Sequence, residues 1–170
     1  MLCWDVATFT PKRVYFSESA PLREISVGGD QVCGVVNGTN RVKCWRGMKG
    51  SPQTPTGVDG FRSISSGLGF SCGILVNNST VRCWGSNSSL AAEIESRFLD
   101  IPMDRIVAGG MHVCGLNSTG FLVCKGSNSS GQLNVPVNEQ YGFKKLALGL
   151  DHSCALRPVS YTHLTLPRRG

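Results

Sequence analysis

Cysteine is the residue type in this chain whose number and spacing could do chemistry. Eight cysteines occur among 170 residues, which is many for a cytosolic protein, where thiols are kept reduced. If two of them lie across a β-hairpin, their side chains face each other at disulfide distance. Three pairs have a suitable spacing, with nine or ten residues between the members: Cys33 with Cys44, Cys72 with Cys83, and Cys114 with Cys124. The spacing therefore predicts one intra-hairpin disulfide in each repeat.

Zinc binding is the alternative use of cysteine. Structural zinc sites are built on closely spaced cysteine pairs, and the chain contains no Cys-x-x-Cys. We therefore expect no metal site. Two cysteines, Cys3 and Cys154, remain outside the three pairs. The repeat would place the partner of Cys3 before Met1 and the partner of Cys154 near Leu164 or Thr165, where no cysteine occurs.

The cysteines recur within a unit of about 40 residues. In residues 61–85 the sequence predicts a strand ending near Ile64, a turn at Gly67, a second strand with Cys72 and a third strand with Cys83. From one unit to the next, the first cysteine and the turn glycine advance together by 39, 42 and 40 residues. A self-similar period of this length, built from β-type units, is typical of a β-propeller. The turn glycines are Gly28, Gly67, Gly109 and Gly149.

The repeats also predict how the chain is organised. Three complete units cover about residues 22–47, 61–86 and 103–128, and parts of two more lie at residues 2–4 and 143–156. We therefore predict an all-β fold, a partial β-propeller of three to four blades, over residues 1–157. Because a propeller typically needs four to eight blades, we expect the chain to be part of a longer protein. Residues 158–170 resemble the translated end of a cloning product, and we expect them to be non-native.

One connector departs from the repeat. Residues 90–98 have no counterpart in the other connectors and account for the three-residue expansion of that unit. We expect them to form one or two turns of helix. A tryptophan follows the second cysteine in every unit except the third, where Lys125 stands. We expect these tryptophans to be buried between blades, the alternative being an exposed aromatic set on one face. These residues are Trp4, Trp45 and Trp84.

Six Asn-x-Ser/Thr acceptors recur at two places in the units. The predicted hairpin tips hold Asn37, Asn77, Asn78 and Asn117, and a position four residues after the second cysteine holds Asn87 and Asn128. A glycan needs an exposed turn. Asn, Ser and Gly favour turns in any protein, so sequons arising by chance are the alternative. Together with the paired cysteines, the six acceptors favour a secreted or cell-surface glycoprotein.

The remaining patterns do not indicate catalysis or nucleic-acid binding. The net charge is +6, but the basic residues are scattered singly along the repeats, so we expect no nucleic-acid partner. No apolar run reaches the roughly 18 residues of a membrane span. His112 and His152 share a repeat position that holds Gln31 and Phe70 in the other units. A catalytic base would need a partnering carboxylate or histidine, so we expect a packing role, with no catalytic residue and no cofactor.

In combination, these motifs resemble a known group of propellers. Gly109-Gly110-Met111-His112 and Gly149-Leu150-Asp151-His152 resemble the Gly-x-x-His signature of propellers like the regulator of chromosome condensation. Residues 126–133 resemble the Gly-x-Asn-x-x-Gly-Gln-Leu segment of that superfamily. The period near 40, the paired cysteines and Cys83-Trp84-Gly85 are similar to the extracellular repeats of plant Crinkly-type receptor-like kinases. Two residues depart from that pattern, Lys125 in place of tryptophan and Arg46 before Gly47.

The resemblance implies a seven-bladed propeller ectodomain on a single-pass membrane receptor with an intracellular Ser/Thr kinase. Such a module, itself non-catalytic, would bind an extracellular peptide or protein ligand, or other receptor ectodomains, at the outer face of the plasma membrane. It would meet the membrane only through another part of its parent. The alternative is an intracellular propeller that acts as a scaffold or guanine-nucleotide exchange factor. That class shares the Gly-x-x-His and Gly-Gln-Leu segments but needs no paired cysteines.

Overall fold

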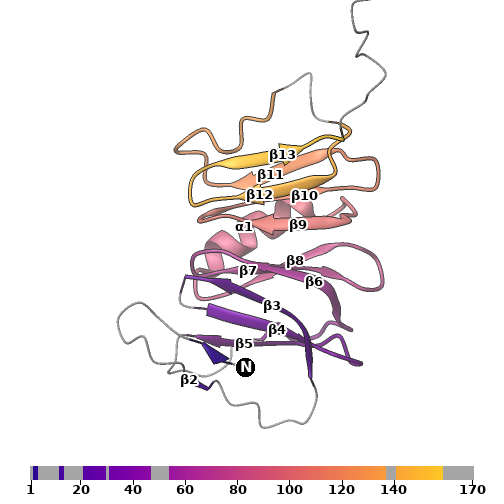
Figure 1. Ribbon diagram of the computed structural model, residues 1–170, viewed down its shortest axis with the longest axis vertical. Helices are drawn as coiled ribbons and strands as arrows, with labels where there is room; N and C mark the ends of the chain where they lie inside the picture. Colours follow the sequence, from indigo (N-terminus) through magenta and orange to yellow (C-terminus); the bar gives the residue numbers. More distant parts are fainter. Residues whose placement is uncertain are drawn as a thin grey trace, which may run out of the picture.

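The computed structural model describes residues 2–3, 12–13, 21–29, 31–46, 54–136 and 141–158. In this part of the chain, small antiparallel sheets are stacked in sequence order along one direction, and one helix lies between two of them (Figure 1). The N-terminal strand lies at one end of the stack and the last strand at the other. Trp4, Gly47 and residues 159–170 lie outside the described residues.

Three of the sheets are three-stranded blades with the same topology. In each, the strand that is second in sequence lies in the centre and pairs antiparallel with the other two. Blade one contains β3 (Leu22–Gly28), β4 (Gln31–Val36) and β5 (Val42–Arg46). Blade two contains β6 (Phe61–Ser66), β7 (Ser71–Leu75) and β8 (Val81–Trp84). Blade three contains β9 (Arg105–Ala108), β10 (His112–Leu116) and β11 (Leu122–Gly126).

Two further sheets have two described strands each. At the C-terminal end, β12 (Lys145–Leu148) pairs with β13 (Ser153–Leu156), and we call this sheet blade four. Near the N-terminus, β1 (Leu2–Cys3) pairs with β2 (Lys12–Arg13). The arrangement confirms the prediction of an all-β fold and a partial propeller.

The register of each hairpin places the two cysteines directly opposite each other. Cys72 pairs with Cys83 in blade two, and the corresponding residues of blades one and three pair in the same way. All three pairs form disulfides, with Cα–Cα distances of 4.0, 4.1 and 4.0 Å. These are short separations, as in the close, non-hydrogen-bonded pairs of antiparallel sheets. The predicted disulfide in each hairpin is therefore confirmed.

The turn glycines recur because successive blades approach each other closely there. A Cβ atom on Gly67 would lie 2.6 Å from the carbonyl oxygen of Gly109, and one on Gly109 would lie 2.6 Å from that of Gly149. The same contact joins Gly28 to Gly67 at 2.4 Å. No side chain fits between these backbones. Each turn glycine thus sets the spacing to the next blade as well as the local turn.

The apolar core of each of the three complete blades contains the same pair of positions. The glycine after the first cysteine lies beneath an apolar side chain near the start of the unit. A Cβ atom on Gly73 would lie 2.3 Å from the Phe61 ring, and Leu22 and Met103 cover Gly34 and Gly115 in the same way. Phe61 and Met103 are fully buried. The large and small residues of these pairs therefore interlock within each blade.

Helix α1 (Ser88–Phe98) is longer than the sequence suggested. It has 11 residues, or about three turns, where we expected one or two. Its buried side chains follow helical spacing and face the core: Leu90, Ala91, Ile94 and Phe98. The helix packs against both β8 and β11. It therefore fills the joint between blades two and three, where the repeat has Lys125 instead of a tryptophan.

Candidate functional site

The joint between blades one and two shows how a disulfide takes part in packing between blades. The indole Nε1 of Trp84 donates a hydrogen bond to Cys44 Sγ at 3.1 Å, and its ring lies 5.1 Å from the ring of Phe61. Trp84 packs against the core cluster that contains Cys33 and Cys44. The tryptophan after the second cysteine of one blade thus covers the disulfide of the blade before it.

A second pair of repeat positions faces across each of the three joints between blades. The two residues are both polar at two of the joints and both apolar at the third. Gln31 Nε2 donates to Ser71 Oγ at 2.8 Å across the first joint. At the third joint, His112 Nε2 lies 3.0 Å from Ser153 Oγ. At the joint between them, Phe70 and Val113 are both fully buried in one cluster. His112 therefore joins two blades, which agrees with a packing role.

His112 is fully buried, whereas His152 at the same repeat position is exposed. Burial lowers the pKa of the His112 imidazole below its ordinary value, although the nearby carboxylate of Asp151 acts in the opposite direction. The folded state therefore favours a neutral imidazole in contact with Ser153.

This lowered pKa predicts a loss of stability in acid. Below the ordinary histidine pKa of about 6.5, the unfolded chain binds more protons at this residue than the folded chain does. The free energy of unfolding should therefore fall as the pH falls from about 7.5 to about 5.5. His112→Gln should reduce this fall, because Gln31 makes the equivalent contact in blade one. Urea unfolding at both pH values measures the effect, and equal losses in the two proteins would exclude His112 as the cause.

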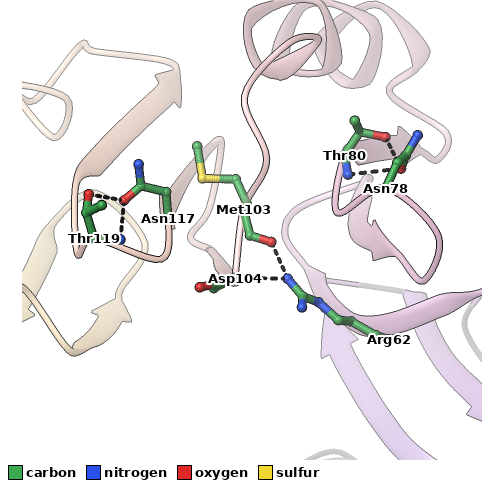
Figure 2. Close-up of polar contacts among 7 residues, drawn as sticks. All are labelled: Arg62, Asn78, Thr80, Met103, Asp104, Asn117 and Thr119. Atoms are coloured by element: carbon green, nitrogen blue, oxygen red, sulfur yellow. Dashed lines mark hydrogen bonds and ion pairs between the residues drawn. The ribbon is translucent and has the colours of Figure 1, made fainter.

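Two of the hairpin tips contain Asn-x-Thr segments that are closed in the same way. Asn78 Oδ1 accepts hydrogen bonds from Thr80 N at 3.1 Å and Thr80 Oγ1 at 2.8 Å. Asn117 Oδ1 accepts from Thr119 N at 3.0 Å and Thr119 Oγ1 at 2.7 Å. Figure 2 shows the two loops. Asn78 is exposed and Asn117 is half-buried, and the oxygens, not the Nδ2 atoms that would carry a glycan, make these bonds.

The other acceptors differ in what their side chains bind. Asn37 is exposed at the tip of blade one. Asn77 Nδ2 donates to Asp59 Oδ2 at 3.2 Å. Asn87 is half-buried, and its Oδ1 accepts from Leu90 N as the N-cap of α1. Asn128 is exposed, and its Nδ2 donates to an Asn134 oxygen at 3.0 Å.

Two arginines link the blades in a way that the sequence analysis missed. Arg62 Nη2 donates to the Met103 carbonyl oxygen and lies 3.3 Å from Asp104 Oδ1 (Figure 2). Arg23 occupies the same repeat position, and its Nη2 donates to the Phe61 carbonyl oxygen at 2.6 Å. Both bonds reach the next blade at the residue that covers its core glycine. The two arginines are 39 residues apart, the same separation as that of Cys33 and Cys72. This shared spacing could have predicted that they make the same contact.

The turns that precede the central strands lie at the ends away from the hairpin tips, and they carry a row of exposed apolar residues. Leu68 and Met111 are 43% exposed and Leu150 is 58% exposed. Their turns are hydrogen-bonded in series, from Leu68 N to Gly110 O at 2.8 Å and from Gly110 N to Leu150 O at 3.1 Å. We call Leu68, Met111 and Leu150 the turn face. Because their turns are hydrogen-bonded in series, these exposed apolar residues are a candidate surface for a partner.

Metal centres and membrane spans are two further classes of site. In the described part of the chain, no group of three or more His, Cys, Asp or Glu side chains is arranged to hold a metal ion. None of the helices described here is long and apolar enough to cross a membrane.

The comparisons with known proteins identify the repeat and the fold. Residues 61–89 match the model of the regulator of chromosome condensation (RCC1) repeat. A comparison with curated proteins finds no match. Among solved structures, the entire ectodomain of the receptor kinase CR4 from Physcomitrella patens is 24% identical, with a TM-score of 0.68. The alignment covers 86% of this chain and 42% of that one.

Two further structures are similar to this chain. The CRINKLY WD40 ectodomain of the receptor kinase ACR4 from Arabidopsis thaliana is 24% identical, with a TM-score of 0.52 over 66% of this chain and 38% of that one. Prp20p from Saccharomyces cerevisiae is 15% identical, with a TM-score of 0.62 over 80% of this chain and 41% of that one. The chain spans less than half the length of each of the three structures. At these identities the likeness supports the fold, an RCC1-like propeller.

Proposed function

We propose that this chain is an extracellular recognition module of a plant receptor-like Ser/Thr kinase, and that it binds a peptide or protein ligand without being catalytic itself. The observation that carries the proposal is the set of three disulfides at one register, with Cys33, Cys44, Cys72 and Cys114 fully buried. Disulfides of this kind persist outside the cell and are rare in the cytosol. The fold likeness to two receptor kinase ectodomains adds support.

The packing around these disulfides strengthens the argument. The Cys44 sulfur accepts a hydrogen bond from the Trp84 indole, so the bridge of blade one is part of the contact with blade two. Reduction would leave two thiols buried in this joint. It would also remove the link that restricts the unfolded chain, which lowers the free energy of unfolding. The blades are therefore best suited to an oxidising compartment.

We further propose that the ligand binds at the turn face and that glycans lie on the hairpin tips. Asn37, Asn78 and Asn117 lie at the tips, at the other ends of the central strands from the turn face. No described contact occupies their Nδ2 atoms. A glycan on Asn128, by contrast, would have to share its Nδ2 atom with the hydrogen bond to Asn134. Glycans on the three tips would leave Leu68, Met111 and Leu150 open to a partner.

Secretion of the chain from plant cells tests the proposal. Peptide mapping before and after reduction should find the three hairpin disulfides and glycans on Asn37, Asn78 and Asn117. Asn78→Gln is a sharp control, because it keeps the sequon at Asn77 while removing the one we expect to be used. Free thiols at Cys33 and Cys44 in the secreted protein would count decisively against an extracellular module.

The fold likeness to Prp20p favours a second candidate, an intracellular scaffold or exchange-type module. The structure of Prp20p is described together with its binding to Gsp1p and histones. Purified Gsp1p and histones are therefore the probes that separate the two functions. Binding of either probe by the reduced chain, together with reduced cysteines in cells, would replace the receptor proposal. We expect neither.

A further inference from the structure

The hairpin tip of blade one contains the single Asn-Gly dipeptide of the sequence, Asn37-Gly38. Both residues are exposed, in the turn between β4 and β5. Asparagine is a chemically labile residue, because the backbone nitrogen of the next residue can attack its side-chain amide carbon. A glycine in that place leaves the nitrogen uncrowded, since it has no Cβ atom. Whether the pair reacts therefore depends on how firmly the tip holds the two groups.

The carboxamide of Asn37 is not held as those of the other two tips are. In blades two and three the threonine hydroxyl donates to the asparagine Oδ1, from Thr80 to Asn78 and from Thr119 to Asn117 (Figure 2). In blade one the corresponding oxygen, Thr39 Oγ1, instead accepts a hydrogen bond from Arg41 N at 3.4 Å. Among the described residues, no hydrogen bond reaches the Asn37 side chain. Its amide group is therefore able to turn toward the backbone.

The attacking nitrogen is equally accessible. Gly38 has a φ of +84°, and a Cβ atom placed on it would have no other atom within 4 Å. The neighbouring amides are engaged, since Asn37 N donates to Pro21 O at 2.8 Å and Asn40 N donates to Val36 O at 3.0 Å. For the Gly38 N–H, no acceptor is found in the described part of the chain. The nucleophile and the carbon that it would attack are thus both unengaged.

We propose that Asn37 is a self-modification site, at which the chain converts this residue to isoaspartate and aspartate through a succinimide formed with Gly38. The Gly38 nitrogen gives its proton to a base and attacks Asn37 Cγ. The new N–Cγ bond forms, the Cγ–Nδ2 bond breaks, and Nδ2 takes up a proton and leaves as ammonia. Water then opens the ring, at Cγ to give aspartate or at the backbone carbonyl carbon to give isoaspartate. One amide and one water become one carboxylic acid and one ammonia, and nothing is oxidised or reduced.

A glycan on Asn37, which is part of the proposed function, would block this reaction because the sugar is attached to the same Nδ2 atom. The modification is therefore confined to chains whose Asn37 carries no glycan. The reaction itself needs only the folded tip and water. It can be measured on unglycosylated protein, so its failure and the failure of the proposed function are separate results.

The modified tip would affect the contact between blades one and two. Isoaspartate adds one carbon atom to the main chain between β4 and the rest of the tip. Asn40, three residues later, binds the next blade, since its carbonyl oxygen accepts from Phe61 N at 2.8 Å. Its Oδ1 also accepts from Arg23 Nε at 3.2 Å. A longer backbone shifts Asn40 relative to both donors, so the first joint should open more readily.

Incubation of the purified full chain, produced without glycans and with its disulfides formed, tests the proposal. Peptide mapping and labelling with an isoaspartyl methyltransferase should show isoaspartate accumulating at residue 37, while Asn78 and Asn117 remain amides. The rate should rise from neutral to mildly alkaline pH, because the attacking amide must lose its proton to a base. Gly38→Ala should slow the reaction about tenfold, since a Cβ atom crowds the nitrogen.

Hydrogen exchange tests the effect on the joint. The Phe61 amide should exchange about fivefold faster in the isoaspartate form, the factor that corresponds to the net contribution of one hydrogen bond. An unchanged exchange rate would contradict the coupling of the tip to blade two.

A matched variant separates the geometry of the tip from the dipeptide itself. Ser79 has a φ of +60°, so Ser79→Gly fits the backbone and gives Asn78 the same following residue as Asn37. Because Thr80 still binds the Asn78 oxygen, Asn78 in this variant should react about tenfold more slowly than Asn37. Adding Thr80→Val should raise its rate. The three hairpin disulfides, mapped in the same digest, verify that each variant is folded.

Two results would overturn the proposal. One is an Asn37 that stays an amide in the folded chain while a synthetic peptide of residues 35–41 is converted. The other is equal reaction at Asn37 and at Asn78 of the Ser79→Gly variant, which would mean that the open tip of blade one has no part in the reaction.

Discussion

Replacing Cys72 and Cys83 together by alanine is expected to lower the free energy of unfolding by about 2–5 kcal/mol. The bond closes a short loop, with a sequence separation of 11 between the two cysteines, and so restricts the unfolded chain. Cys72 is also fully buried in the core cluster that joins blades two and three. Both effects act in the same direction, so this should be among the most destabilising changes in the chain.

Urea unfolding measures this loss, followed by circular dichroism and by tryptophan fluorescence. The two signals should be compared, because stacked repeats can unfold in more than one step. Cys154→Ala is the matched control, since that cysteine is exposed and has no disulfide. It should change the stability by no more than about 0.5 kcal/mol. If the Cys72 and Cys83 double variant also lost no more than about 0.5 kcal/mol, the stability of the hairpin would not depend on its disulfide.

Phe61→Ala should lower the free energy of unfolding by about 3–5 kcal/mol. The ring is fully buried, lies over Gly73 within its own blade and packs against Trp84. Its backbone carbonyl also accepts the hydrogen bond from Arg23 of blade one. Loss of the ring would leave a cavity at the point where the blade core and the joint between blades meet.

Phe61→Leu is the control for this change, because Leu22 holds the same position in blade one. It keeps most of the buried volume and should cost no more than about 1.5 kcal/mol. Because the chain has three tryptophans, the emission of Trp84 is measured with Trp4 and Trp45 replaced by Phe. It reports on the same joint and should shift to longer wavelength in Phe61→Ala as the indole becomes wetter. An unchanged emission together with a small loss of stability would mean that Phe61 does not hold the joint.

The cysteine spacing was sufficient to predict the hairpins because a disulfide restricts both distance and register. Cys72 and Cys83 can bond only if their strands pair with these residues opposite each other, and the same argument applies in each repeat. In blade two, the predicted first strand ends near Ile64 and the observed one at Ser66, and Cys72 and Cys83 lie in the second and third strands as predicted. The spacing of residues close together in the sequence was therefore enough to predict most of the fold of a single blade.

The contacts between blades were harder to predict, because they join residues about 40 positions apart. Gly67 was predicted as a turn residue, yet its lack of a side chain is required by the Gly109 carbonyl of the next blade. The bond from Arg62 to the Met103 carbonyl was missed for the same reason. Helix α1 was predicted too short because its start depends on the Asn87 cap, which we had considered only as a glycan acceptor.

The matched contacts across the joints have a consequence for the order of the units. Gln31 bonds to Ser71, Phe70 and Val113 lie in one buried cluster, and His112 lies within hydrogen-bond distance of Ser153. If the second and third units were exchanged in the gene, Gln31 would face Val113 and lose its Ser71 acceptor, keeping only Cys33 Sγ of its own blade. Phe70 would face the Ser153 hydroxyl. The loss of a side-chain hydrogen bond of this kind costs about 1 kcal/mol. Although the repeats look alike, they are not interchangeable. A protein with exchanged units would be destabilised at two of its three joints between blades.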